Sequence, residues 1–311
     1  MSQPKPGMTV AIVSPGGYAP DEAGLRRALE RLESHGCIVR NYYRHEARHH
    51  RFGATDDERV AQLHDAARDP EVDVVIALRG GYGMSRLLPR LDFGLLAASG
   101  KLFVGHSDIT ALHMGLLCHG ATSLAGPMIC DDFTREELSD FTMRHFWDCI
   151  AVDHCDVTGA VPEALADNPA VDCRGTLWGG NLAMLTHLLG TPYLPAIDGG
   201  ILFVEDVNEH PYRVERMLLQ LLHGGVLGRQ EALVLGDFSN YRLSDYDNGY
   251  DFNAMLAWLR CEIPIPIVTG LPFGHVADKV TLVVGSDAQL QTNPRGLQLQ
   301  MHGYPVIKRD A

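Results

Sequence analysis

The sequence predicts an α/β protein: a doubly wound parallel sheet, followed by a smaller, β-rich domain of mixed α/β type. Two observations support this prediction. In the first half, short apolar runs alternate with helical patterns, and strands separated by helices of this length are typical of a parallel, doubly wound sheet. In the second half, short apolar runs follow one another closely, which favours a mixed, partly antiparallel sheet.

The elements of the first half follow from hydrophobic periodicity and from turn residues. Strands are expected where the chain is apolar and bounded by glycine or polar residues, at Thr9–Val13, Ile38–Tyr42, Val72–Leu78 and Leu102–Gly105. Helices are expected over residues 22–35 and 56–67 and from Asp108 onward, with Thr55 or Asp56 as the cap of the second. In such sheets, ligands bind beyond the carboxyl ends of the strands.

Residues 155–174 contain prolines, glycines and acidic residues and are expected to connect two domains, residues 1–154 and residues 175–311. Beyond this connection, helices are expected at Leu182–Leu189 and Tyr212–Leu222. Strands are expected at Ile201–Val204, Leu233–Leu235, Val280–Val284, Gln289–Gln291 and Leu297–Gln300. The length of 311 residues is sufficient for two separate cores.

Composition narrows the class of protein. The chain is 46% hydrophobic and 21% charged, as in an ordinary globular protein, and its net charge of −13 argues against general affinity for nucleic acid. No apolar run reaches transmembrane length, and the first residues lack the apolar core of a signal peptide. The seven cysteines are scattered without a C-x-x-C pair. We therefore expect a cytoplasmic protein with reduced thiols and no membrane partner.

The stretch FVGHSDITALHMGLL places Ser107 between a strand and a helix. Serine there can cap the helix, because its oxygen accepts hydrogen bonds from first-turn amides. Alternatively, Ser107 is a nucleophile on a tight strand-to-helix turn, where the following N–H groups and the helix dipole stabilise an oxyanion. The motif G-x-S-x-G fits at Gly105 and Ser107, but Ile109 replaces the second glycine.

The stretch LRGGYGMSRLLP begins directly after an expected strand and contains Gly80, Gly81 and Gly83. Glycines at such a position allow the backbone to approach a ligand closely. The spacing is not that of a nucleotide-binding loop, so a plain turn is the alternative. If Ser107 is a nucleophile, this loop can supply a second oxyanion donor.

Two further motifs resemble metal sites. HEARH, from His45 to His49, matches the zinc-peptidase pattern, but four arginines surround it and Gly53 would cut the helix short, so a solvated basic connection is favoured. SDYDNGYDF resembles a calcium loop, but its glycine is one place early and its last glutamate is missing. An acidic loop capped by Asp251 is favoured.

Two residues could complete a catalytic triad. Glu205 lies at the end of the apolar run ILFVED, where a carboxylate can cap a helix or orient a catalytic histidine. His275 follows a glycine in LPFGHVADKVTL, in a loop before an expected strand. Each signal is weak alone.

Taken together, five segments resemble the LD-carboxypeptidase family of serine peptidases (family S66). The segments are, in order, RGGYGMSRLLP, GHSDITA, GTLWGGNLAML, LFVEDVNEHPYRVERMLLQL and GLPFGHVADKVTL. The resemblance implies a flavodoxin-like first domain that carries the nucleophile Ser107, and a second domain that carries the triad acid Glu205 and the base His275. It implies oxyanion donors at Asp108 and at Gly81 or Gly80, with no metal and no cofactor.

The resemblance also implies a substrate and an assembly. The expected reaction removes the terminal D-alanine from a murein tetrapeptide or related muropeptide, in cytoplasmic cell-wall recycling, by a homodimer whose active site lies between the domains. Because this substrate carries carboxylates, arginines are expected near it. Expected substrate contacts are Arg79, Tyr82, Trp178, Asn181 and Arg213.

Two alternatives stay open at this point. The microcin-immunity branch of the same family cleaves peptidyl or aminoacyl nucleotides, but residues 155–174 contain no tryptophan that could stack on a base. From another class, the chain could be a two-domain ligand-binding protein without chemistry.

Overall fold

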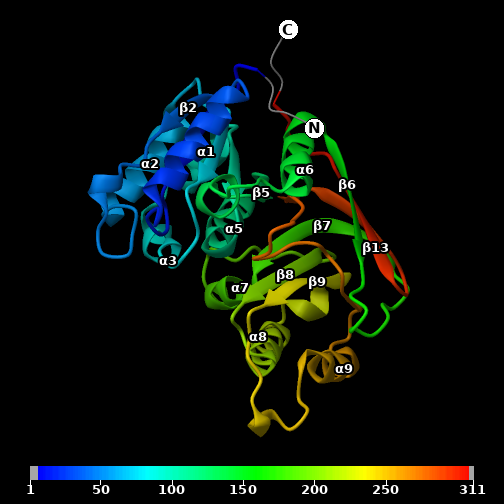
Figure 1. Cartoon of the computed structure of the whole chain (residues 1–311). Coiled ribbons are helices and arrows are strands. Elements are labelled where there is room, and N and C mark those ends of the chain that lie inside the picture. The colour runs from blue at the N-terminus through cyan, green and yellow to red at the C-terminus, as the bar shows by residue number, and fades with distance from the viewer. Residues whose placement is uncertain (1–5, 308–311) are drawn as a thin grey trace. The chain divides into compact units, whose positions relative to one another are not determined.

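The computed structural model describes residues 6–307 and divides the chain into two compact units (Figure 1). Unit 1 comprises the chain up to Asp153, together with Ala277–Val284 and the segment from Pro305 onward. Unit 2 comprises His154–Val276 and Gly285–Tyr304. The chain therefore leaves unit 2 for the short segment Ala277–Val284, returns to it, and leaves it again at Pro305.

The sheet of unit 1 has the strand order β11-β5-β4-β3-β1-β2. Its strands are β1 (Thr9–Val13), β2 (Ile38–Asn41), β3 (Val74–Ala77), β4 (Leu102–Gly105), β5 (Ser123–Ala125) and β11 (Leu282–Val284). The first five pair in parallel, and β11 is antiparallel to β5. The order 2-1-3-4-5 is that of a flavodoxin-like sheet, so the predicted doubly wound fold is confirmed.

The helices of unit 1 are α1 (Glu22–Ser34), α2 (Asp56–Arg68), α3 (Met84–Leu87), α4 (Phe93–Ala98), α5 (Thr110–Cys118) and α6 (Asp140–Ala151). Because β2 and β3 lie on opposite sides of β1, right-handed crossovers place α1 and α2 on opposite faces of the sheet. α2 begins with a capping box in which Thr55 and Glu58 each bind the other's backbone amide, as the sequence predicts for Thr55.

The sheet of unit 2 has the strand order β10-β9-β8-β7-β12-β13-β6. Its strands are β6 (His154–Ala160), β7 (Asp172–Asn181), β8 (Ile201–Val207), β9 (Ala232–Ser239), β10 (Ile267–Val268), β12 (Asp287–Asn293) and β13 (Gly296–His302). β7 to β10 are parallel, whereas β12, β13 and β6 add antiparallel pairs, which confirms the predicted mixed sheet.

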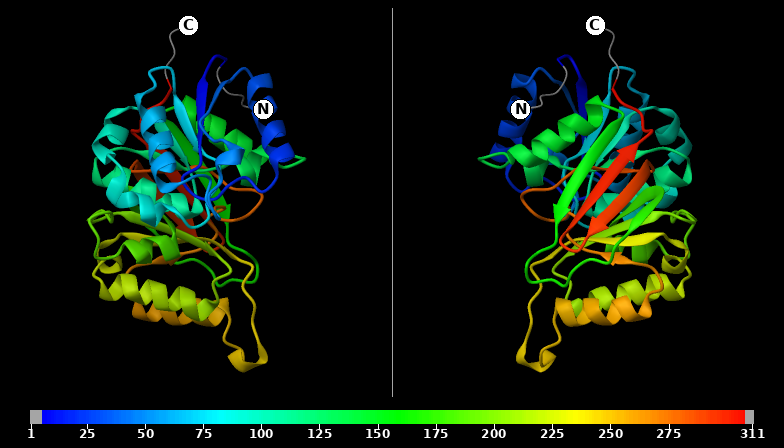
Figure 2. Two further views of the ribbon diagram at one scale, coloured as in Figure 1. Left: turned by 90° about the vertical axis from the view of Figure 1, so that its left-hand side faces the viewer. Right: turned by 90° about the vertical axis from the view of Figure 1, so that its right-hand side faces the viewer.

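The helices of unit 2 are α7 (Leu182–Leu188), α8 (Pro211–His223) and α9 (Phe252–Glu262). α8 and α9 lie side by side below the sheet, and the loop between β9 and α9 extends beyond them (Figure 2). Asp251 caps α9 by accepting a hydrogen bond from the Ala254 amide, as the sequence predicts for this acidic loop.

The structure divides the chain differently from the sequence-based expectation in two places. The strand expected at Val280–Val284 is β11, and it belongs to the sheet of unit 1 rather than to that of the second domain. Residues 155–174, expected as a connection, contain most of β6 and the start of β7. β6 alternates buried Cys155 and Val157 with exposed neighbours, and its partner β13 lies more than 130 residues away, so no local turn signal marks the pair.

Among residues 6–307, no helix combines the length and apolar character that a bilayer-spanning segment needs. All seven cysteines are free thiols.

Candidate active site

Ser107 occupies a strained turn directly after β4. Its φ is +63°, in the left-handed region that non-glycine residues rarely adopt. Ser107–Ile109 form a short 3-10 turn that leads into α5, and neither this turn nor α5 begins with a side-chain cap. Ser107 is half-buried between the buried residues His106 and Asp108. Helix capping therefore does not explain the serine, whereas a nucleophile elbow requires this backbone conformation.

Close packing around β4 holds the turn in place. A Cβ on Gly105 would lie only 3.0 Å from Cγ1 of Ile109. Ile109 stands where the motif G-x-S-x-G has its second glycine. Here this buried isoleucine packs against Gly105, the first glycine of the motif. His113 on α5 forms hydrogen bonds of 2.8 Å through Nε2 to the Gly105 carbonyl and through Nδ1 to Ser123 Oγ. Burial lowers the pKa of His113 to about 4, so this imidazole is neutral and structural.

The glycine loop lies directly against Ser107. A Cβ on Gly80 would lie 2.8 Å from Cβ and 2.9 Å from Oγ of Ser107. The loop and the turn are also joined by the buried Asp108, whose Oδ2 accepts a 2.7 Å hydrogen bond from the Met84 amide at the start of α3. Gly81 has a φ of +78°, and a Cβ there would meet no atom within 4 Å. The loop therefore does more than turn the chain, because its backbone at Gly80 packs directly against the serine.

The sequence analysis did not identify Arg59, whose side chain forms hydrogen bonds that hold the glycine loop in place. Its side chain is fully buried, and Nη1 donates to the carbonyls of Pro15 and Gly83. Nη2 donates to Asp56 at 2.6 Å, which supplies the charge partner a buried guanidinium needs. Arg59 thus ties the turn after β1 to the turn after β3, the two strands where the winding of the sheet reverses. Its place on α2 carries no motif that could have revealed this role.

The packing of Gly80 leads to a direct prediction. Gly80→Ala should lower kcat by about 100-fold, because the added methyl group must displace the Ser107 side chain, and misplacement of a reacting group by about 1 Å can have an effect of this size. The matched control is Gly81→Ala, which meets no atom but takes on an unfavourable φ. It should lower the free energy of unfolding by about 1–2 kcal/mol and change kcat less. Steady-state kinetics and thermal melts separate the two effects, and equal loss of kcat in both variants would contradict the prediction.

Glu205 and His275 form a pair within unit 2. Glu205 lies on β8 with a fully buried side chain, and its Oε2 lies 2.7 Å from Nδ1 of His275. The His275 side chain is 22% exposed, and a hydrogen bond from Nδ1–H to the carboxylate leaves Nε2 as the basic nitrogen. This is the orientation that a general base in a serine hydrolase requires.

Glycines on β9 and beside His275 make this pair possible. A Cβ on Gly236 would lie 2.4 Å from the Phe273 carbonyl oxygen. A Cβ on Gly274, whose φ is +148°, would lie 3.4 Å from Glu205 Cβ and 3.1 Å from Asp237 Cβ. The Asp237 amide donates to the Phe273 carbonyl at 2.7 Å. The loop before His275 is therefore pressed against β8 and β9 by contacts that only glycine permits.

Polar neighbours surround Glu205. Asn181, at the end of β7, donates through Nδ2 to Glu205 Oε1 at 3.3 Å and to Asp206 Oδ1 at 3.0 Å, while its Oδ1 caps α7 at the Met184 amide. Asp206 accepts hydrogen bonds from the amides of Ala183 and Val207, and burial together with the Glu205 charge raises its pKa to about 6. Burial and Glu205 also raise the pKa of Asp237.

Two of the expected substrate contacts occupy structural positions. Trp178 is 1% exposed, and its indole donates to Gln230 Oε1 at 2.9 Å, so it belongs to the interior of unit 2. Asn181 is 6% exposed, and its amide binds Glu205 and Asp206. Its position favours support of the carboxylates over contact with a ligand.

The other expected contacts retain polar or aromatic groups that a substrate could reach. Tyr82 is half exposed and lies near the Phe52 ring. Arg79 is half-buried, and its Nε has no hydrogen-bond partner within residues 6–307. Arg213 is exposed and pairs with Glu209 at 2.6 Å. Arg216, on the same helix, lines a separate hollow with Leu189 and Leu219.

The HEARH segment does not form the helix that zinc binding would need. His45–Ala47 is a single 3-10 turn, His45 Nδ1 contacts the Tyr43 hydroxyl, and His49 forms a bridge with Phe52. Within residues 6–307, no group of three or more potential ligands is arranged to hold a metal.

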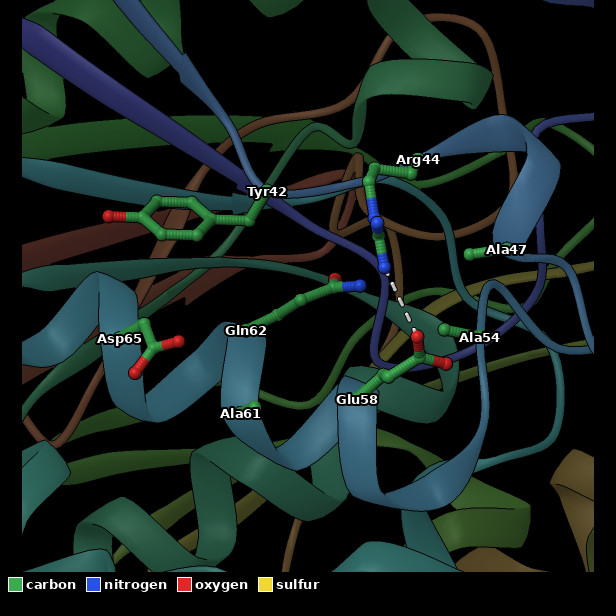
Figure 3. A pocket seen from close by; sticks show the side chains of 8 residues that line it. All are labelled: Tyr42, Arg44, Ala47, Ala54, Glu58, Ala61, Gln62 and Asp65. Atoms are coloured by element: carbon green, nitrogen blue, oxygen red, sulfur yellow. Dashed lines mark hydrogen bonds and ion pairs between the residues drawn. The ribbon is translucent and has the colours of Figure 1, made fainter.

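A small pocket of unit 1 lies beside this segment, and it contains neither Ser107 nor the glycine loop. Figure 3 shows its lining, where the ion pair between Arg44 and Glu58 crosses the pocket at 3.2 Å. The candidate residues of unit 1 lie instead after β3 and β4, whereas the pair of Glu205 and His275 belongs to unit 2.

A strained serine after a parallel strand, with a glycine loop packed against it, and a histidine oriented by a buried carboxylate are the features of a serine hydrolase. The LD-carboxypeptidase N-terminal domain matches residues 10–126, and the LD-carboxypeptidase C-terminal domain matches residues 174–290. The chain belongs to the LD-carboxypeptidase family and is a serine-type LD-carboxypeptidase. This finding excludes the alternative that the chain is a ligand-binding protein without catalytic activity.

Similar proteins cover almost the whole chain. The probable murein peptide carboxypeptidase of Bacillus subtilis is 31% identical over 92% of this chain and 89% of its own. The murein tetrapeptide carboxypeptidase of Pseudomonas aeruginosa is 32% identical over 91% and 93%. The crystal structure of muramoyltetrapeptide carboxypeptidase from Oxalobacter formigenes superposes with a TM-score of 0.92 at 57% identity, over 96% and 100%. The microcin C7 self-immunity protein shares the fold, with a TM-score of 0.86 at 22% identity over 98% and 99%.

Proposed function

We propose that this enzyme removes the terminal D-alanine from murein tetrapeptides by cleaving the bond between the L-centre of the diamino acid and D-alanine. The observation that carries the proposal is the φ of +63° at Ser107, because a strained serine at the end of a strand persists only where the surrounding structure holds it. The names of the relatives from Pseudomonas aeruginosa and Oxalobacter formigenes support the choice of substrate.

In the proposed mechanism, Ser107, His275 and Glu205 act as one triad. His275 Nε2 takes the proton of the Ser107 hydroxyl while Oγ attacks the scissile carbonyl carbon. The amides of Asp108 and Gly81, or of Gly80, donate hydrogen bonds to the oxyanion that forms. The imidazolium then returns its proton to the nitrogen of D-alanine, which leaves, and a water molecule hydrolyses the acyl-enzyme by the same steps.

Glu205 contributes by orientation and by charge. Its hydrogen bond of 2.7 Å holds the proton on Nδ1 of His275, so that Nε2 is free to act as the base. When the imidazole gains its proton, the buried carboxylate stabilises the positive charge. The amide of Asn181 keeps Glu205 in position from the other side.

The test is product analysis by mass spectrometry. Incubation of a murein tetrapeptide with the enzyme should yield the tripeptide and free D-alanine, and a tetrapeptide that ends in L-alanine is the matched control. Cleavage of the L-alanine peptide alone would contradict the proposal. Release of a nucleotide from a peptidyl nucleotide, without tetrapeptide cleavage, would favour the microcin-immunity alternative.

We also propose cytoplasmic cell-wall recycling as the setting and a homodimer as the assembly. The seven free thiols support a reducing compartment, since disulfides are rare there. Cell fractionation tests the location, and light scattering tests the oligomeric state.

A further inference from the structure

Unit 2 contains a polar cavity of about 780 Å³ beyond the carboxyl ends of β8 and β9. It has no carboxylate among its lining residues, which are Asn208, His210, Tyr212, Arg213, Asn240, Tyr241 and Arg242. Glu205 lies on β8, three residues before Asn208, so the cavity and the catalytic carboxylate share one edge of the sheet.

The ends of β8 and β9 shape this cavity. Asn208 and Asn240 follow the two strands, and each has a φ of +61°, a conformation that asparagine tolerates better than most residues. The Asn208 amide donates to the Ser239 carbonyl at 2.8 Å, so β8 and β9 end side by side at the same edge of the sheet. The chain then continues from β9 into the loop that extends past α8 and α9 (Figure 2).

The charged residues that line this cavity are all basic, in a chain whose net charge is −13. Arg213 pairs with Glu209 through Nε at 2.6 Å, and His210 pairs with Asp247 at 3.1 Å. The exposed Arg242 has no ion pair within residues 6–307. One guanidinium is therefore uncompensated beside asparagine amides and tyrosine hydroxyls, which are groups that bind an anion well.

We infer that this cavity binds a carboxylate of the peptide substrate, with Arg242 and Arg213 as the donors. This inference rests on the proposed function. A strand rises about 3.3 Å per residue and β8 is irregular between Val204 and Asp206, so the Asn208 backbone lies within about 10 Å of that of Glu205. The carboxylate carbon of the leaving D-alanine is two bonds, about 2.5 Å, from the nitrogen that is cleaved. The carboxylate is assigned to the acyl part, which is the larger part of the peptide and extends further from the cleaved bond than the carboxylate of D-alanine does.

The experiment measures KM and kcat for the full-length enzyme and its Arg242→Ala variant. The substrates are the parent tetrapeptide and versions in which each carboxylate of the acyl part is amidated in turn. Arg242→Ala should raise KM for the parent peptide about tenfold and leave kcat within about twofold. The peptide in which the bound carboxylate is amidated should already have a raised KM with the wild-type enzyme. Arg242→Ala should not raise the KM of this peptide further.

Matched variants make the outcome decisive. Arg242→Lys should recover part of the affinity, because it restores the charge but not the planar fork. Arg174→Ala removes the same charge at an exposed ion pair with Asp287 on the antiparallel side of the sheet, and it should leave KM unchanged. A thermal melt checks that each variant is folded.

Three results would overturn the inference. The first is an unchanged KM for the parent peptide in the Arg242→Ala variant. The second is a KM that this variant raises equally for the parent and all amidated peptides. The third is a KM that this variant raises only for a phosphate-bearing substrate. If the wild-type enzyme cleaves none of the peptides, the proposed function itself fails, and this outcome is distinct from the other three.

Discussion

Ser107→Ala is expected to lower the rate constant for tetrapeptide cleavage by about 10⁴–10⁶, which is the size of effect found when the nucleophile of a serine triad is removed. The variant lacks the oxygen that forms the acyl-enzyme in the proposed mechanism, whereas the turn, the glycine loop and the His275–Glu205 pair remain. Substrate binding and the fold should therefore be retained. Conversion of tetrapeptide to tripeptide, followed by mass spectrometry, measures the rate, and retention of more than a few per cent of activity in a folded variant would contradict the assignment.

The backbone strain at Ser107 gives this prediction a second readout. Ser107→Gly also removes the hydroxyl, but glycine adopts a φ of +63° without the steric cost of a Cβ. Ser107→Gly should therefore be as inactive as Ser107→Ala and more stable than it by about 1 kcal/mol. Denaturant titrations of the two variants test this difference. An alanine variant that is the more stable of the two would argue against stored strain.

Glu205→Gln is expected to lower kcat by about 10³–10⁴, by analogy with other triads. Glutamine keeps the size of the side chain, but its amide group can favour the tautomer whose basic nitrogen faces residue 205. It also removes the charge that stabilises the imidazolium formed during catalysis. The 2.7 Å contact with His275 and the complete burial of Glu205 make both effects strong. Steady-state kinetics with the tetrapeptide measures the loss.

The neighbouring acids serve as controls. Asp206→Asn should reduce stability more than kcat, because an amide cannot accept all of the bonds that its two oxygens take from Ala183, Val207 and Asn181. Glu209→Gln should change both quantities little, since Glu209 forms a partly exposed ion pair with Arg213. If Asp206→Asn or Glu209→Gln is inactive and Glu205→Gln is active, Glu205 is not the triad acid.

Several features of the molecule could be predicted because their signals are local. The apolar runs at β1, β3, β4 and β8 lie where the sequence places them, since a buried parallel strand must be continuously apolar. The serine after β4 and the carboxylate at the end of β8 are also visible as residues next to strand ends. In contrast, Trp178 in a motif shared with the family suggested a ligand contact, and its burial against Gln230 could not be read from its neighbours in the chain.

The sequence by itself determined the two kinds of sheet, the positions of most strands, and the places of Ser107 just after β4 and of Glu205 near the end of β8. Only the tertiary structure decided that β11 joins β5, that Gly80 lies against Ser107 and that Glu205 binds His275. Each of these contacts joins residues between 27 and about 160 positions apart. Periodicity and turn chemistry report only on the few residues around a position, whereas pairing between distant segments depends on how the whole chain packs.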